Sequence, residues 1–153
     1  MNTKKTIAIL GAGESGIGAA LLAKKLGYEI FVSDNGKINS EHTHTLRTNA
    51  IPYEESGHTL KTILEANEVI KSPGIPDNIS IIQNILKQGI PVISEIEFAS
   101  RHTDATIIGI TGSNGKTTTT NLTYHILDTA KLNVGIGGNV GKSFARNISE
   151  HTF

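Results

Sequence analysis

Two glycine-rich segments hold the residues whose types and spacing point most directly to chemistry. The first, Gly11–Gly16, reads G-A-G-E-S-G and fits the pattern G-x-G-x-x-G. It follows the apolar run Thr6–Leu10 and opens Ser15–Leu26, which has helical apolar spacing. Glycines permit a tight turn there, and free N–H groups at a helix start attract a diphosphate. The predicted nucleotide-binding positions are Gly11, Gly13, Ser15 and Gly16.

A carboxylate supports this interpretation of the first segment. Asp34 ends the predicted strand Glu29–Ser33 and stands 18 residues after Gly16 (34−16). A carboxylate at that place can accept hydrogen bonds from ribose hydroxyls. The alternative is a glycine turn without a ligand, and the pattern alone does not identify the nucleotide.

The second segment, Gly112–Thr118, reads G-S-N-G-K-T-T after the apolar run Thr106–Thr111. Loop N–H groups can surround phosphates, Lys116 can reach the β- and γ-phosphate oxygens, and the Thr117 hydroxyl can bind Mg²⁺. The two glycines are 3 positions apart (115−112), whereas the usual P-loop has 5, so this is a shortened P-loop. The predicted ATP-binding residues are Gly112, Ser113, Asn114, Gly115, Lys116, Thr117 and Thr118.

Weaker signals come from two further loops and from the histidines. Ser72 lies in K-S-P-G-I-P (71–76) after a predicted strand, and Asn139 lies in G-I-G-G-N-V-G (135–141). Either loop could contact a ligand, and the alternatives are an ordinary turn and a plain flexible loop. The six histidines show no convincing ligand spacing. We expect His42 and His44 to be solvated and His125 to be structural.

Composition excludes several classes of function. The 153 residues include 14 Lys+Arg and 14 Asp+Glu, so no basic excess favours binding to nucleic acid or an anionic membrane. Cysteine is absent, which excludes disulfides and thiolate metal sites. No segment approaches the roughly 20 apolar residues of a membrane span. We therefore expect a soluble, cytoplasmic protein.

Strands alternating with helices predict an α/β fold with parallel pairing. The expected strands are Thr6–Leu10, Glu29–Ser33, a short edge strand within 36–57, Glu68–Lys71, Pro91–Ile93, Thr106–Thr111 and Val134–Ile136. The expected helices are Ser15–Leu26, Glu41–Thr48, Ile79–Lys87, Glu95–Arg101 and Thr117–Ala130. A polar stretch at 101–105 predicts a boundary between a Rossmann-like domain, 1–101, and the beginning of a P-loop ATPase α/β domain, 102–153. Two strands cannot close a core alone, so the second part is expected to be incomplete.

Taken together, the motifs resemble the Mur ligase family, ATP-dependent amino-acid ligases of bacterial cell-wall synthesis. The resemblance spans nearly the whole chain, in family order, and rests on Gly11–Gly16, S-P-G-I-P (72–76), S-E-I-E-F (94–98), Thr111–Thr118 and G-N-V-G (138–141). The shortened P-loop is itself a family trait. Folylpolyglutamate synthetases are similar at the P-loop but lack a first domain of this kind. The S-P-G-I and S-E-I-E stretches favour the member that adds D-glutamate, and Asn114 disfavours the member that adds L-alanine, which typically has histidine there.

The resemblance implies a role for each matched residue. The first domain would bind the UDP part of UDP-N-acetylmuramoyl-L-alanine, with Ser15 near the diphosphate and Asp34 and Asn35 near the uridine. Ser72 would lie near the phosphate–sugar region and Asn139 near the muramoyl part. ATP would bind at the P-loop, with Lys116 as the catalytic residue on the transferred phosphoryl group and Thr117 on Mg²⁺. The substrate carboxylate would become an acyl phosphate that the amine of D-glutamate attacks.

The sequence departs from the family pattern in places. Glu14 brings an acid into the diphosphate turn and must point outward or weaken binding, and Gly36 stands where some relatives have a basic residue. Because the family's further Mg²⁺-binding acid, modified lysine and D-glutamate domain lie beyond Phe153, we expect a fragment without turnover. We also expect a monomer. Two other hypotheses are a non-catalytic module that binds NAD or UDP, and an NAD-dependent dehydrogenase. A second phosphate loop has no role in the dehydrogenase.

Overall fold

The computed structural model describes residues 5–138 and 140–151, and its centre is a parallel sheet. The strands are β1 (Thr6–Leu10), β2 (Glu29–Ser33), β3 (Tyr53–Glu54), β4 (Glu68–Lys71) and β5 (Val92–Ser94), in the order β3-β2-β1-β4-β5. Ile7 of β1 pairs with Ile30 of β2 on one side and with Glu68 of β4 on the other. Strand order reverses between β1 and β4, and ligands of open α/β sheets bind at such a switch point. The predicted Rossmann-like α/β class is confirmed.

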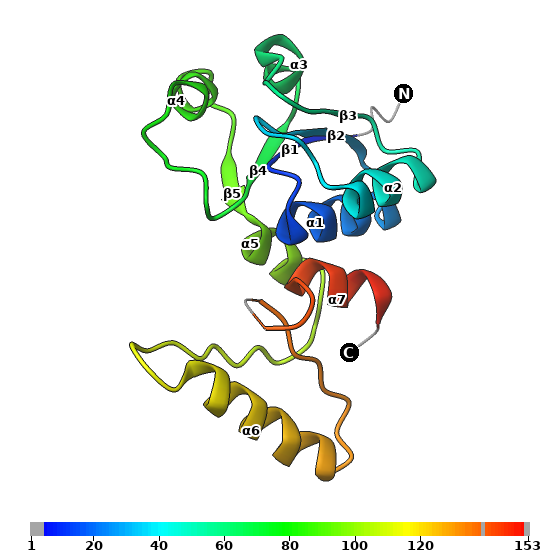
Figure 1. The fold of residues 1–153 in the computed structure, drawn as a ribbon, viewed down its shortest axis with the longest axis vertical. Helices are drawn as coiled ribbons and strands as arrows, with labels where there is room; N and C mark the ends of the chain where they lie inside the picture. Colours follow the sequence, from blue (N-terminus) through cyan, green and yellow to red (C-terminus); the bar gives the residue numbers. More distant parts are fainter. Residues whose placement is uncertain (1–4, 139, 152–153) are drawn as a thin grey trace.

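Helices cover both faces of this sheet (Figure 1). They are α1 (Glu14–Lys25), α2 (Ser40–Thr48), α3 (Leu60–Leu64), α4 (Ser80–Lys87), α5 (Glu95–Ser100), α6 (Lys116–Thr129) and α7 (Phe144–Glu150). Helices α1, α2, α5 and α7 lie on one side, and α3 and α4 lie on the other. Helices α3 and α7 were not predicted from the sequence, because each is a single turn or two with little periodic pattern. No helix in the described ranges is long and apolar enough to cross a membrane.

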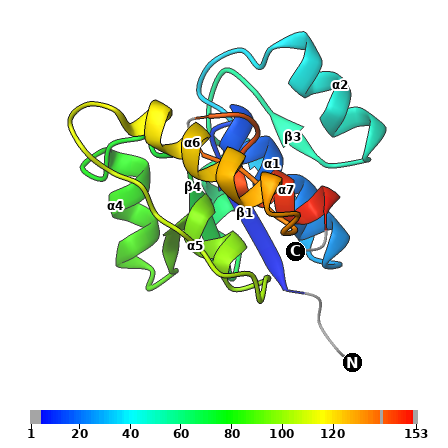
Figure 2. The same ribbon diagram turned by 90° about the horizontal axis from the view of Figure 1, so that it is seen from below.

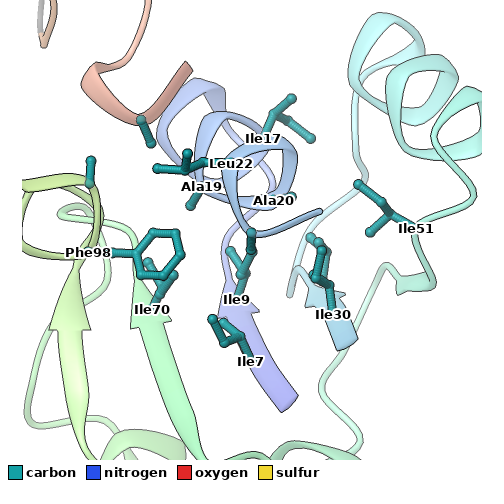
Figure 3. Close-up of a cluster of buried hydrophobic side chains, with 14 of the residues drawn as sticks. Ile7, Ile9, Ile17, Ala19, Ala20, Leu22, Ile30, Ile51, Ile70 and Phe98 are labelled. Atoms are coloured by element: carbon teal, nitrogen blue, oxygen red, sulfur yellow. The ribbon is translucent and has the colours of Figure 1, made fainter. Parts of the chain in front are cut away.

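Alternation along β1 divides the core into two layers. Ile7 and Ile9 pack beneath α1 with Phe98 of α5, as Figure 3 shows. Ala8 and Leu10 point to the opposite face, where α3 and α4 cover them. Because every residue of β1 beyond Thr6 is buried, the strand reads as a continuous apolar run, as expected of a parallel sheet with helices on both faces.

Helix ends follow a common backbone motif. Gly27 adopts φ +80° after α1, and the N–H of Tyr28 donates to the carbonyl of Ala23 at 3.0 Å. Gly89 does the same after α4, with φ +72°. This left-handed residue satisfies the last carbonyls of a helix and turns the chain toward the next strand. Lys131 closes α6 in the same conformation, at φ +62°, without being a glycine.

The segment that contains α6 differs from the prediction. Strands Thr106–Thr111 and Val134–Ile136 are not formed, because the described residues offer them no neighbouring strand with which to pair. Ile107 and Ile108 are more than half exposed, and α6 buries none of its side chains. In Figure 1 this segment extends away from the sheet, and the chain then returns to place α7 against α1 and α5. Seen from below in Figure 2, α6 lies in front of α1 and α7. The boundary at residue 101 stays a prediction.

Candidate functional site

The glycine-rich loop connects β1 to α1 in a geometry that requires glycine. Gly11 has φ +92°, and a Cβ added at Gly16 would lie 1.8 Å from the Gly11 carbonyl oxygen. Gly13 is the N-cap of α1, and no side chain in the described structure caps this helix start. The first N–H groups of a helix have no partner within the helix. The start of α1 therefore presents N–H donors suited to an anion, at the predicted positions Gly13, Ser15 and Gly16.

Asp34 ties this loop to the end of β2. Its Oδ2 accepts the N–H of Ala12 at 2.6 Å, and its Oδ1 accepts the N–H of Gly36 at 2.8 Å. A carboxylate has about four lone-pair positions, so both oxygens can accept a further bond. Asp34 thus fixes the loop and keeps acceptor capacity for a sugar hydroxyl.

A cleft of about 590 Å³ opens at the carboxyl ends of the strands. Its polar side consists of residues at the ends of β1, β2 and β3, namely Gly11, Asp34, Asn35 and His58. Its mainly apolar part comes from α3, α4 and the loop after β4: Leu60, Ile75, Pro76, Ile79 and Ile81, together with Gly74, Ser80 and Asn84. One polar and one apolar side suit a ligand with a charged end and a flat apolar part.

The loop after β4 meets the glycine-rich loop. The Ser72 N–H donates to the Leu10 carbonyl at 3.0 Å, and its Oγ lies 3.5 Å from the Gly11 carbonyl oxygen. A Cβ at Gly11 would come within 2.5 Å of that Oγ. The structure therefore brings Gly11, Asp34, Asn35 and Ser72 to one edge of the sheet. Asn139 lies outside the described residues.

Two histidines near the cleft were not recognised from the sequence. The His58 Nδ1 lies 2.6 Å from the Oγ of Ser33, a fully buried residue whose Oγ is also 2.6 Å from Glu54 Oε1. His42 was expected to be solvated, yet its Nδ1 lies 2.7 Å from the Ala12 carbonyl oxygen. The contact of His58 with Ser33 could have been suspected from the polar residues Ser33 and Glu54, which end adjacent strands.

Hydrogen bonding keeps the Glu54 carboxylate ionised. Burial by itself would raise its pKa, but the bonds from Ser33 and Thr59 outweigh burial and leave the pKa below its usual value. Thr59 donates through both its N–H, at 2.7 Å, and its hydroxyl, at 2.5 Å. Glu54 therefore acts as a fixed acceptor beneath the cleft.

The P-loop, residues 112–118, is exposed and contributes no residue to the lining of the cleft, and the segment that contains it stands apart from the sheet (Figure 1). Gly115 is the N-cap of α6 at φ +75°, a conformation that disfavours other residues. The Lys116 ammonium group donates to the Gly112 carbonyl and lies 3.3 Å from the Ser113 carbonyl oxygen. The lysine thus folds over its own loop. No side chain in the described structure caps α6, so the amides near Lys116, Thr117 and Thr118 suit phosphate oxygens.

Glu14 points away from the site where a diphosphate would bind. Its Oε2 accepts a bond from the Arg146 guanidinium of α7 at 2.8 Å, and its Oε1 accepts the Ser143 N–H at 3.1 Å. The acid in the turn is therefore neutralised by α7. Glu95 of α5 lies close by, almost fully buried, and accepts the N–H of Ala145. Burial raises the pKa of Glu95, an effect that the Ala145 bond partly offsets and the charge of Glu14 reinforces.

Comparison with known sequences decides the family. Residues 6–81 match the profile described as MurD N-terminal domain, and residues 110–153 match the Mur ligase middle domain. The chain belongs to the Mur ligase family. It is 58% identical over 146 residues to the UDP-N-acetylmuramoylalanine--D-glutamate ligase of Bacteroides thetaiotaomicron, covering 95% of this chain and 33% of that protein. The enzyme of the same name from Porphyromonas gingivalis strain W83 is 57% identical over 95% of this chain and 32% of its own length.

A solved Mur ligase structure agrees with the fold. The UDP-N-acetylmuramate:L-alanyl-gamma-D-glutamyl-meso-diaminopimelate ligase from Neisseria meningitides superposes with a TM-score of 0.62 at 27% identity, over 92% of this chain and 46% of that one. This Mur ligase chain spans about a third of the length of the curated relatives it matches.

Proposed function

We propose that this Mur ligase chain binds a uridine diphosphate substrate in the cleft and ATP at the P-loop, within a ligase that joins D-glutamate to UDP-N-acetylmuramoyl-L-alanine. The observation that carries the proposal is the uncapped start of α1 beside the cleft, where the acid within the turn, Glu14, is held by Arg146. The high identity to D-glutamate ligases supports the choice of substrate.

The residues of the chain can perform separate parts of such a reaction. N–H groups at Gly13, Ser15 and Gly16 would hold the diphosphate, and Asp34 and Asn35 would face the nucleoside. Ser72 lies beside Gly11, where a phosphate–sugar group would pass. Asn139 would contact the muramoyl part.

At the P-loop, the amides of Gly112, Ser113, Asn114, Gly115 and Thr118 would surround the phosphates. The ammonium group of Lys116 would exchange its contacts with the Gly112 and Ser113 carbonyls for the γ-phosphoryl group. There it would neutralise charge while the phosphoryl group is transferred to the substrate carboxylate. Thr117 would offer its hydroxyl to Mg²⁺, which supplies further charge neutralisation when bound. The amine of D-glutamate would then displace phosphate from the acyl phosphate. We propose that the protein works in the cytoplasm, where its nucleotide substrates are made, and as a monomer.

Calorimetry on this chain tests the binding part. UDP and UDP-N-acetylmuramoyl-L-alanine are expected to bind more tightly than NAD, and Mg-ATP is expected to bind independently of both. Tighter binding of NAD would contradict the proposal and favour a dinucleotide-binding module.

A substitution tests the catalytic part in a ligase with the full length of its curated relatives. Lys116→Ala is expected to abolish D-glutamate-dependent ADP release while leaving the affinity for UDP-N-acetylmuramoyl-L-alanine unchanged. Lys87→Ala, an exposed lysine in the last turn of α4, is the matched control and is expected to retain the rate. Ligation that survives loss of Lys116 would contradict the role given to it.

A further inference from the structure

Asp34 lies between the glycine-rich loop and His58, and it contacts the residues on both sides. Asp34 holds Ala12 through its carboxylate, and its own carbonyl accepts the Gly57 N–H at 3.2 Å. His58 follows directly and lines the cleft with Asp34 and Asn35. A nucleoside diphosphate anchored by its diphosphate at α1 would extend its ribose toward Asp34 and its base toward His58.

The partners of Ser33 determine which nitrogen of His58 carries the proton. The Glu54 carboxylate is ionised and can only accept, so the single hydroxyl proton of Ser33 is donated to Glu54. The Ser33 oxygen must then accept from His58, which places a proton on His58 Nδ1. A neutral imidazole with Nδ1–H has a bare Nε2, which acts as a hydrogen-bond acceptor.

The second ring nitrogen, Nε2, belongs to a residue that lines the cleft. Ser33 is fully buried beneath the cleft, and Nδ1 points to it, so Nε2 on the far side of the ring is directed away from that buried serine. No hydrogen bond of Nε2 occurs within the described part of the chain. The cleft thus offers an acceptor of fixed position, together with apolar side chains that would pack on the face of a base.

We propose that His58 selects uracil, by accepting a hydrogen bond from the N3–H of the base at Nε2. Uracil has a proton on N3, whereas N3 of cytosine has none. The N3 of cytosine and Nε2 of His58 would then be two acceptors with no hydrogen between them, and their lone pairs would repel each other. A site built around a hydrogen bond strongly disfavours an analogue that leaves its polar group unpaired. The inference rests on the proposed uridine substrate and identifies the residue that recognises its base.

The test compares UDP, CDP and N3-methyl-UDP by calorimetry on this chain. The unaltered chain is expected to bind UDP roughly tenfold or more tightly than either analogue. In His58→Phe, UDP binding is expected to weaken until the three ligands bind within about threefold of each other. In His58→Gln, whose amide can donate or accept, UDP affinity is expected to persist while CDP affinity rises.

The pattern across variants separates base recognition from damage to the fold. A merely structural role for His58 would lower the affinity for all three ligands by the same factor and would overturn the inference. His125→Phe, an exposed histidine on α6, is the matched control and is expected to retain the preference for UDP. If both His58 variants kept the same preference for UDP, the role of His58 would be overturned but the proposed substrate would stand. If the unaltered chain did not bind UDP, the proposed substrate would be overturned as well.

Discussion

The sheet unit, residues 5–100, and the P-loop segment, residues 102–136, contain similar sequence patterns but pack very differently. In the sheet unit, apolar residues of strands and helices are buried on both faces of the sheet. In the P-loop segment, Ile107, Ile108, Leu122, Ile126 and Leu132 are all more than half exposed. The pattern of a strand or an amphipathic helix thus specifies an element only where another element is present to cover it. Burial, more than local propensity, makes the difference between the two regions.

The largest contrast is expected from matched core truncations. Ile85→Ala in α4 removes a side chain that is 0% exposed and should lower the free energy of unfolding by about 2–5 kcal/mol. Ile126→Ala in α6, where the side chain is 57% exposed, should change it by less than about 0.5 kcal/mol. Urea denaturation measures both. Equal losses would show that α6 is covered in solution and would remove the distinction between the regions.

A second prediction concerns the glycines of the first loop. Gly16→Ala would push a methyl group into the Gly11 carbonyl, so we expect about 1–3 kcal/mol of destabilisation and a loss of UDP binding. Gly13→Ala meets no atom within 4 Å and is expected to retain stability. Thermal unfolding with and without UDP distinguishes the two variants. A stable, UDP-binding Gly16→Ala protein would mean that the loop is more open than described.

A third prediction tests how α7 is attached to the sheet unit. Arg146→Ala removes the partner of Glu14 and should weaken the docking of α7 by about 1–2 kcal/mol. Amide hydrogen exchange should then speed up at 144–150 and stay unchanged in α6. Lys142→Ala, which breaks an exposed ion pair with Glu150, is the control and should have a much smaller effect. Similar exchange in both variants would contradict the anchoring role of Arg146.

The smallest expected effect is a change in the pH dependence of stability. Because the pKa of Glu95 is raised in the folded protein, the folded state holds this proton more tightly, and stability falls as pH rises from the ordinary glutamate value through the raised one. Glu95→Gln can still accept from Ala145 and should remove that fall. Glu54, whose pKa is lowered, contributes with the opposite sign, since its stabilisation is lost as pH falls. Unfolding curves from about pH 4, near the ordinary glutamate pKa, to about pH 8 check this. If stability in Glu95→Gln changed with pH as steeply as in the unaltered chain, the prediction would be contradicted.

Most of the sheet unit could be predicted from the sequence because its strands are continuous apolar runs and its helices end at glycines such as Gly27 and Gly89. Helix α6 was also predicted, from its position after the P-loop. The prediction of a strand at 106–111 was wrong. Its apolar pattern is that of a strand in a sheet, but no neighbouring strand for it to pair with is among the described residues. The contacts of His42 and Glu14 could not be predicted, since each joins residues 30 or more positions apart, and no local pattern specifies such pairs. For His58 the available sign was that Ser33 and Glu54 end adjacent strands.

The packing of α7 on α1 has a consequence for motion of the P-loop. Gly18 leaves room for Ser143, so the chain that departs after α5 is fixed again to the same unit at the start of α7. The excursion between them is anchored at both of its ends (Figure 1). Two attachment points limit how far this segment can move from the sheet unit, because both of its connections must stay within reach of α5 and α7. The P-loop therefore stays tethered to the unit that contains the cleft, which raises its effective concentration near that unit.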